Sequence, residues 1–290
     1  MNDLTVWVDG EFTTMNDAKA SLMSHGLHYG TGVFEGIRCY ETDKGPAIFR
    51  LQDHLDRFAA GTDALGMEVD VQSLGIAALE LVRRNNQASA YVRPLSFFEL
   101  GGLGLDTAPL TPRSLVATIP WKNHLGNAAE VGLKMKTVSV RRTPANSVPP
   151  LKLCGNYVNS ILAKREAYKQ GFDEALFVDH DGYVVEATGE NVFLVNDSKI
   201  VAVEHADALK GITRQTIIDL YDVEVRRVHL NELLEADEVF LTGTSAEVTW
   251  VSALDGVIYR NNPVTRVVAQ RYANVVHGRA NECHEWLTWA

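Results

Sequence analysis

The chain has 290 residues, of which 46% are hydrophobic and 22% charged, and its formal net charge is −10. This composition is typical of a folded enzyme with a sizeable core, and it excludes wholesale disorder. Because 37 acidic residues outnumber 27 basic ones, nucleic acid and anionic membranes are not expected as partners.

The cysteines and the N-terminus indicate a compartment. The three cysteines, Cys39, Cys154 and Cys283, are odd in number and widely spaced, and no CxxC pair occurs. We therefore expect reduced thiols in a cytoplasmic protein, with neither a disulfide framework nor a metal site. The N-terminus carries acids and no basic stretch, so no signal peptide is expected. No apolar run approaches the roughly 18 residues of a membrane helix.

The N-terminal part of the chain alternates short strands with two amphipathic helices. The segment TVWVDGEF alternates apolar and polar residues around Asp9 and Gly10, which predicts a β-hairpin. From Leu51 the apolar residues recur with the helical period, and a second such pattern covers 71–86. Residues 1–120 are therefore expected to form a small, open α/β layer domain. Its other predicted strands are 32–41, 46–50, 89–98 and 113–121.

The polar stretch KNHLGNAAE has no hydrophobic period, and we take residues 121–130 as an interdomain loop. Beyond it, many short strands with turns between them predict a barrel-like or strongly curved sheet. Residues 131–290 are expected to form a larger pseudo-barrel domain with surrounding helices, so the fold class is α+β. The predicted strands are 131–140, 174–179, 183–187, 191–196, 199–203, 223–228, 238–242, 248–252 and 256–260, and the predicted helices are 156–170, 213–222 and 263–277.

Lys152 is the first candidate for chemistry. It stands between Leu151 and Leu153, after two prolines and before an amphipathic helix. One interpretation is structural, because a lysine can lie along apolar surface with its charged end in water. The other is a Schiff-base lysine, whose amine must be neutral to attack a carbonyl and is made so by apolar neighbours. The cofactor would then be pyridoxal 5′-phosphate, which also needs an acid, a phosphate site and a partner for its phenolic oxygen.

Glu186 and the segment LKGITRQTI supply the first two of these parts. Glu186, near a predicted strand end in DGYVVEATGENVF, is the candidate acid for the pyridine nitrogen; the alternative is an ordinary surface glutamate. Gly211, Ile212 and Thr213 stand at the start of a predicted helix, with Thr213 as the expected N-cap. The free N–H groups of such a helix start attract phosphate.

Further candidates complete the cofactor site. The turn that contains Gly243, Thr244 and Ser245 is a second expected anion site. Arg57 lies off the apolar stripe of its helix, where most arginines are solvated, but it could supply fixed positive charge. Tyr157, five residues after Lys152, is a candidate donor to the phenolic oxygen or, alternatively, a core tyrosine.

Together these motifs resemble the branched-chain amino acid aminotransferases, within fold type IV of the pyridoxal-phosphate enzymes. The resemblance extends from about residue 7 to about residue 275. No single motif would suffice, but their combination and order are highly specific. The matching stretches are MSHGLHYGTGVFEGIRCYET, FRLQDHLDRF, AYVRPLSF, GGLGL, IPW, KLCGNYVNS, DGYVVEATGENVF, GITRQTI and ADEVFLTGTSAEVT.

The resemblance implies a ping-pong transaminase that moves the amino group between L-leucine, L-isoleucine or L-valine and 2-oxoglutarate. Lys152 would be the Schiff-base lysine and proton shuttle, Glu186 the partner of the pyridine nitrogen, and Tyr157 that of the phenolic oxygen. The residues implied to hold the cofactor phosphate are Arg57, Gly211, Ile212, Thr213 and Thr244.

The resemblance also assigns the substrate site. Tyr91 and the amides of Thr244 and Ser245 would meet the α-carboxylate, and Arg93 the distal carboxylate of glutamate or 2-oxoglutarate. The residues implied to wall the side-chain pocket are Tyr29, Phe34, Trp121 and Tyr157, with Leu103 and Leu105 reaching in from a neighbouring subunit. A homodimer or larger homo-oligomer is therefore implied.

Three departures from the family pattern bear on substrate range and loop order. Relatives commonly have LPGITR, whereas Lys210 here replaces the proline, whose fixed φ is lost, so the loop is expected to be looser. The segment AVEHADA stands where relatives have TPP, and His124 stands where they often carry a tyrosine.

Three alternative functions remain at this point. The first is a transaminase of the same fold type for D-amino acids or (R)-amines, against which YVRP and the apolar pocket wall argue. The second is an aminodeoxychorismate lyase, which would release pyruvate without an amino acceptor. The third is a non-catalytic phosphate- or ligand-binding protein, whose function would survive Lys152→Ala.

Overall fold

The computed structural model of the chain describes residues 4–121 and 128–290. Within them the backbone forms two compact units. The first contains the N-terminal segment through residue 121 together with Leu151–Asn156 and Asn274–Ala290, and the rest of the described chain forms the second. The expected domains, 1–120 and 131–290, follow chain order, whereas the first unit also takes in the short segment that carries Lys152 and the C-terminal tail.

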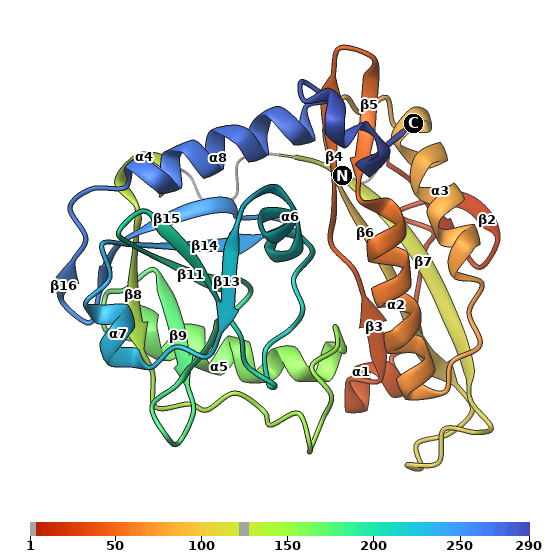
Figure 1. Cartoon of the computed structure of the whole chain (residues 1–290). Coiled ribbons are helices and arrows are strands. Elements are labelled where there is room, and N and C mark those ends of the chain that lie inside the picture. Colours follow the sequence, from red (N-terminus) through yellow and green to blue (C-terminus); the bar gives the residue numbers. More distant parts are fainter. Residues whose placement is uncertain (1–3, 122–127) are drawn as a thin grey trace. The chain divides into compact units, whose positions relative to one another are not determined.

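The first unit is built on an antiparallel sheet of eight strands in the order β17-β5-β4-β6-β7-β1-β2, with β3 paired to β6. Helices α2 and α3 pack on this sheet (Figure 1). The strands are β1 (Thr5–Val8), β2 (Glu11–Thr14), β3 (Gly32–Phe34), β4 (Ile37–Thr42), β5 (Gly45–Phe49), β6 (Ala90–Leu100), β7 (Thr111–Pro120) and β17 (Leu287–Trp289), and the helices are α1 (His25–Tyr29), α2 (Leu51–Leu65), α3 (Val71–Arg84) and the 3-10 helices η1 (Cys154–Asn156) and η2 (Asn281–Trp286).

Local sequence explains most of these elements. The predicted hairpin of β1 and β2 is confirmed: Asp9 and Gly10 have φ of 48° and 101°, as a tight two-residue turn requires. Helix α3 begins at the predicted residue because Asp70 caps it, accepting from the Ser73 amide. Helix α2 ends at Gly66 in the left-handed conformation.

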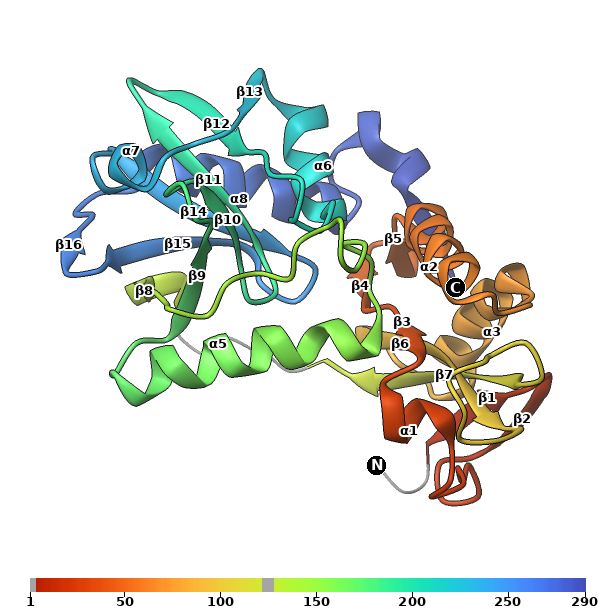
Figure 2. The ribbon, with the colours of Figure 1, turned by 90° about the horizontal axis from the view of Figure 1, so that it is seen from below.

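The second unit is a strongly curved sheet of nine strands in the order β10-β9-β8-β15-β14-β11-β12-β13, with β16 paired to β15. Helix α5 runs along β9 and β8 (Figure 2). The strands are β8 (Leu133–Thr137), β9 (Glu174–Val178), β10 (Val184–Ala187), β11 (Asn191–Asn196), β12 (Lys199–Val203), β13 (Val223–Arg226), β14 (Glu238–Gly243), β15 (Glu247–Leu254) and β16 (Val257–Ile258), and the helices are α4 (Ala128–Val131), α5 (Tyr157–Lys169), α6 (Ile212–Leu220), α7 (Leu230–Leu234) and α8 (Pro263–Val276), whose last residues belong to the first unit.

The two ends of this second sheet meet. The Val184 amide at the start of β10 donates to the Val228 carbonyl at 2.9 Å, just beyond β13. Tyr183 and His229 form an antiparallel bridge at the same place. The sheet therefore closes on itself around an apolar core that includes Leu194 and Leu241. The predicted α+β class with a pseudo-barrel is confirmed.

Some predictions need correction. Thr213 is not the N-cap of α6: the cap is Gly211, which is extended, and the helix already begins at Ile212. Residues 128–130, expected in the loop, belong to α4. The rest of that loop, including His124, lies outside the described residues. Helices α1 and α7 and strand β17 were not predicted, because each has five residues or fewer and too short a pattern to recognise.

Two further observations concern the environment of the chain. Cys39, Cys154 and Cys283 are all free thiols, as predicted. None of the helices in residues 4–121 and 128–290 combines the length and the apolarity that a membrane crossing requires.

Candidate active site

Lys152 lies in the first unit, beside strand β3. The Phe34 amide donates a hydrogen bond to the Lys152 carbonyl at 3.2 Å. The next residue, Leu153, forms an antiparallel bridge with Val33. The backbone of Lys152 is therefore held by the sheet of the first unit, which restricts where its amine can reach.

The surroundings of the Lys152 amine favour loss of its proton. Removal from water lowers the pKa of Lys152 to about 8; Glu35 opposes this effect, and Arg57 and Arg93 add to it. The Nζ atom lies 4.7 Å from the centre of the Phe34 ring. Because an exposed lysine has a pKa of about 10.4, the neutral, nucleophilic form is far more populated here at neutral pH. These observations favour the functional interpretation of Lys152 over the structural one.

Glu35 is a residue of this site that sequence analysis missed. Its buried carboxylate accepts from Arg57 Nε at 2.6 Å and from His54 Nδ1 at 2.7 Å. Burial alone would raise the pKa of Glu35, but the charges and hydrogen bonds of Arg57 and His54 outweigh burial and bring that pKa well below its usual range. The signal was available, because a glutamate inside the apolar segment VFEGI cannot be buried without a partner.

Arg57 is therefore not a solvated surface arginine. It lies on α2 with a side chain that is 13% exposed. Besides the Nε contact, one terminal nitrogen donates to Oε2 of Glu35 at 3.0 Å. This two-point contact fixes the plane of the guanidinium. His54 shares the carboxylate, and burial lowers the pKa of His54 although Glu35 raises it, so the imidazole is neutral and donates from Nδ1.

Four predicted substrate residues lie together in the same unit. Arg93 donates to the Tyr91 hydroxyl at 3.1 Å, and its guanidinium lies 4.7 Å from the centre of the Phe34 ring. Tyr91 stacks on Trp121 with ring centres 5.5 Å apart. A Cβ added at Gly36 would lie 1.8 Å from the Tyr91 hydroxyl oxygen, so this position requires glycine. A cation and a phenol thus stand beside apolar rings.

Tyr29, Leu103 and Leu105 lie around the end of α1. The Tyr29 hydroxyl donates to the Leu103 carbonyl at 2.9 Å. His25 Nε2 lies 2.9 Å from the Gly104 carbonyl. These contacts tie the GGLGL loop to α1, yet Leu105 is 81% exposed and Tyr29 48% exposed. These predicted wall residues of the pocket therefore face solvent in the single chain.

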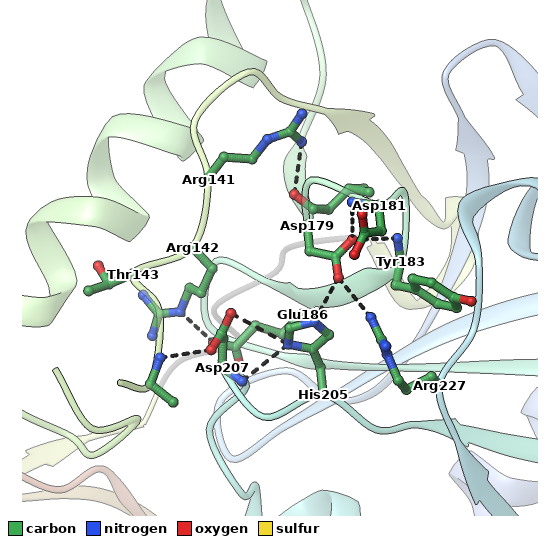
Figure 3. A network of polar contacts seen from close by, with 12 residues as sticks. Arg141, Arg142, Thr143, Asp179, Asp181, Tyr183, Glu186, His205, Asp207 and Arg227 are labelled. Atoms are coloured by element: carbon green, nitrogen blue, oxygen red, sulfur yellow. Dashed lines mark hydrogen bonds and ion pairs between the residues drawn. The ribbon is translucent and has the colours of Figure 1, made fainter. Parts of the chain in front are cut away.

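Glu186 lies in the second unit, near the end of β10, and it is buried. Arg142 Nε donates to its Oε1 at 2.7 Å, and the Leu209 amide donates to its Oε2 at 3.0 Å (Figure 3). The guanidinium favours the ionised carboxylate, which is the form that stabilises a protonated pyridine nitrogen. The surface-glutamate alternative is wrong. Sequence analysis did not single out Arg142, because its partner lies 44 positions further along the chain.

The start of α6 fits an anion. Gly211 is its N-cap, and no side chain among the described residues caps the helix. The first N–H groups, at Ile212 and Thr213, therefore point out of the helix start with its positive dipole end. A Cβ added at Gly211 would lie 2.0 Å from Asn191 Oδ1, so the backbone here passes Asn191 too closely for any other residue.

The other predicted residues of the second unit occupy their expected elements. Thr244 and Ser245 stand in the turn between β14 and β15, which is closed by the Gly243–Glu247 pair. Tyr157 is the first residue of α5 and is partly buried. Lys210, expected to loosen its loop, forms an ion pair with Glu204. Within the described part of the chain, no three His, Cys, Asp or Glu side chains gather as a metal site.

The amine of Lys152 gives a prediction for pH dependence. With an amine-selective acylating reagent, its labelling rate should rise with pH to a midpoint of about 8, because only the neutral amine reacts. Glu35→Gln removes the charge that raises this pKa, so the midpoint should fall. Peptide mass spectrometry measures both. Lys164 is the internal control, because Glu174 outweighs its burial and raises its pKa. A Lys152 midpoint above that of Lys164 would contradict the prediction.

Comparisons with known proteins agree with this geometry. The profile of the family described as amino-transferase class IV matches residues 32–254. The branched-chain-amino-acid aminotransferase of Pseudomonas aeruginosa is 39% identical over 99% of this chain and 97% of its own. The one of Escherichia coli K12 is 38% identical, over 97% of this chain and 96% of its own.

Solved structures give the same result. The branched-chain amino acid aminotransferase of the organism abbreviated T.th., complexed with N-(5′-phosphopyridoxyl)-L-glutamate, superposes with a TM-score of 0.95 at 44% identity, covering 100% of this chain and 99% of that one. Its structure with pyridoxamine 5′-phosphate gives a TM-score of 0.96, with the same identity and coverage. The predicted resemblance and fold type are confirmed. Because the family profile covers most of the chain and the relatives span nearly all of it, the chain belongs to the amino-transferase class IV family.

Proposed function

We propose that the chain is a pyridoxal-phosphate-dependent transaminase for the branched-chain amino acids leucine, isoleucine and valine. The observation that carries this proposal is Lys152, a lysine whose pKa is lowered to about 8, in a chain that matches branched-chain aminotransferases over nearly its full length. We further propose 2-oxoglutarate as amino acceptor and a ping-pong order, in which the amino donor leaves as an oxo acid before the acceptor enters.

The described residues fit pyridoxal 5′-phosphate part by part. Lys152 presents a neutral amine to its aldehyde, and Glu186 presents an ionised carboxylate to its pyridine nitrogen. The uncapped start of α6 at Ile212 suits its phosphate, with Gly211, Thr213, Thr244 and Arg57 as further phosphate ligands. Tyr157 would donate to the phenolic oxygen. When bound, the cofactor supplies an aldehyde for amine exchange and a ring that withdraws electrons from the substrate α-carbon.

Lys152 has two roles in this mechanism. Its neutral Nζ first holds the cofactor, and after release by the substrate amine it accepts the substrate α-proton. A pKa of about 8 suits both tasks, because the group can then gain and return a proton near neutral pH. The sheet contact at Phe34 keeps the backbone of Lys152 fixed while the side chain moves.

The substrate residues sort into polar and apolar groups. The Tyr91 hydroxyl, polarised by Arg93 at 3.1 Å, and the amides of Thr244 and Ser245 would bind the α-carboxylate. The rings of Tyr29, Phe34, Trp121 and Tyr157 would surround a branched aliphatic side chain, with Leu103 and Leu105 of a neighbouring subunit closing the pocket. Arg93 would bind the distal carboxylate of 2-oxoglutarate, so that one pocket takes both substrates.

The proposed function is tested by the visible absorption of the purified, cofactor-supplemented protein. Adding L-leucine should bleach the cofactor band and release 4-methyl-2-oxopentanoate, and adding 2-oxoglutarate should restore the band. Lys152→Ala should lose turnover by about 10⁴-fold or more, since it removes both nucleophile and base. Bleaching by D-amino acids or (R)-amines alone would refute the branched-chain assignment, and a protein that never develops the band would refute the cofactor.

Arg93 gives a second prediction, on substrate choice. Arg93→Gln should lower kcat/KM for 2-oxoglutarate by roughly tenfold to a hundredfold, because a charge-assisted hydrogen bond of about 1.5–3 kcal/mol is lost. The loss for 4-methyl-2-oxopentanoate should be several-fold smaller. Tyr91→Phe is the matched control, because it touches the α-carboxylate that both substrates share and should affect both equally. Equal losses in Arg93→Gln would assign Arg93 to the α-carboxylate instead.

We also propose that the protein is a homo-oligomer in the cytoplasm. Helix α5 exposes a stripe of large apolar side chains at helical spacing: Val158, Ile161, Leu162 and Tyr168. Such a contiguous patch is typical of a subunit interface. The GGLGL loop, with Leu105 exposed, would then complete a neighbour's pocket. The three free thiols suit a reducing compartment.

The oligomer is tested by sedimentation velocity. The wild-type chain should sediment as a dimer or larger species, and Ile161→Glu with Leu162→Glu should shift it toward the monomer, because charges are costly in an apolar interface. Ile258→Glu is the control, since Ile258 is likewise exposed, at 67%, but lies on β16. A wild-type monomer, or equal dissociation by the control, would contradict the proposed interface.

A further inference from the structure

The carboxylate of Glu186 is held from both sides by groups that have no place in the assignments above. Arg142 Nε contacts Oε1, and the Leu209 amide contacts Oε2. The side chains of Arg142 and Glu186 are only 8% and 6% exposed. A buried charge that keeps a single orientation needs this kind of complete hydrogen bonding.

Arg142 is itself fixed by α5. One of its terminal nitrogens donates to Asn159 Oδ1 at 3.1 Å, and the Thr143 amide donates to the same oxygen at 3.3 Å. Asn159 Nδ2 donates in turn to the Arg141 carbonyl at 2.8 Å. The amide of Asn159 thus fastens both the backbone around Arg142 and its guanidinium, so Arg142 approaches Glu186 from a preset direction.

The other side of the carboxylate depends on the segment 205–209. Asp207 accepts from the Ala145 amide at 2.7 Å, and the Asp207 amide donates to His205 Nδ1 at 3.1 Å (Figure 3). His205 Nε2 lies 3.2 Å from Asp179 Oδ2. Because the Asp207 amide occupies Nδ1, the imidazole carries its hydrogen on Nε2 and donates it to Asp179. This chain of contacts sets the position of the Leu209 amide.

We propose that Arg142 is a positioning residue, whose guanidinium, together with the Leu209 amide, fixes the Glu186 carboxylate in the orientation that receives the pyridine nitrogen. Arg142 acts through Glu186 and touches neither cofactor nor substrate. The proposal rests on the proposed function for its consequence in catalysis, but the contact itself exists without the cofactor, and the two can be tested apart.

The first test uses the cofactor-free chain and hydrogen exchange by mass spectrometry. Glu186→Ala removes the acceptor of the Leu209 amide, so exchange in the peptide that contains Leu209 should rise by about tenfold or more. Arg142→Gln should approach this value, because an unpaired buried carboxylate loses its orientation. In the double variant, Arg142→Gln should add little to Glu186→Ala. Independent, additive effects would refute the proposal, since coupled residues are non-additive.

Arg141→Gln is the matched control. Arg141 is the neighbouring residue and also uses its guanidinium, but it donates to the Val178 carbonyl at 2.8 Å and not to Glu186. Its substitution should leave exchange at Leu209 within about twofold of wild type. Arg142→Lys keeps the charge without the fixed planar contact and should lie between wild type and Arg142→Gln.

The second test uses the cofactor-saturated enzyme. Arg142→Gln should lower kcat by about tenfold or more and leave KM for L-leucine within about threefold, because substrate binding residues are untouched. If exchange at Leu209 does not respond while the wild-type protein binds cofactor and turns over, this proposal falls and the function stands. If exchange responds but no cofactor band ever forms, Arg142 positions Glu186 and the proposed function falls. Equal losses of kcat in Arg142→Gln and Arg141→Gln would reduce Arg142 to a structural residue.

Discussion

The first unit depends on one buried ion pair, Glu35 with Arg57. A phosphate-binding arginine and a neutral lysine conflict, because a nearby cation lowers the pKa of an amine while burial already lowers it. Glu35 resolves the conflict by compensating the guanidinium at 2.6 Å and by raising the lysine pKa. The result is an amine with a pKa of about 8, close enough to neutral pH to exchange protons.

The second unit solves the mirror-image problem with Arg142 and Glu186. A carboxylate that must stay ionised in a buried place needs a cation, yet it must keep room for a protonated ring nitrogen. The guanidinium takes one oxygen, and a backbone amide, which carries no net charge, takes part of the other. In both units, therefore, a group with a chemical task is flanked by an oppositely charged residue that keeps it in the right protonation state.

How far the sequence predicted this architecture depended on the distance between partners. The hairpin at Asp9 and the helix after Leu51 follow from neighbouring residues, and both were predicted. Lys152 was found because its apolar neighbours are adjacent in sequence. Glu35 was missed because His54 and Arg57 lie 19 and 22 positions away. Its burial was legible in VFEGI, but no local pattern names its partners.

The same reasoning explains the errors at element ends. Thr213 is a better intrinsic N-cap than Gly211, yet the helix begins before Thr213, at Ile212. Asn191 leaves no space for a side chain at residue 211 and its amide donates to the Leu209 carbonyl at 2.8 Å, which fixes the direction of the chain before the helix. A tertiary contact thus overrode a local preference, and it did so where an uncapped helix start serves anion binding.

The division of the chain into two units has a chemical consequence. Lys152 belongs to the first unit although the residues before 151 and after 156 belong to the second. The groups that shift its pKa are Glu35, Arg57, Tyr91 and Arg93, all in the first unit, whereas Glu186 is held by Arg142 and Leu209 of the second. The nucleophile and the ring acid are therefore tuned by separate sets of residues, and substitutions in one set can change the proton affinity of one group without disturbing the other.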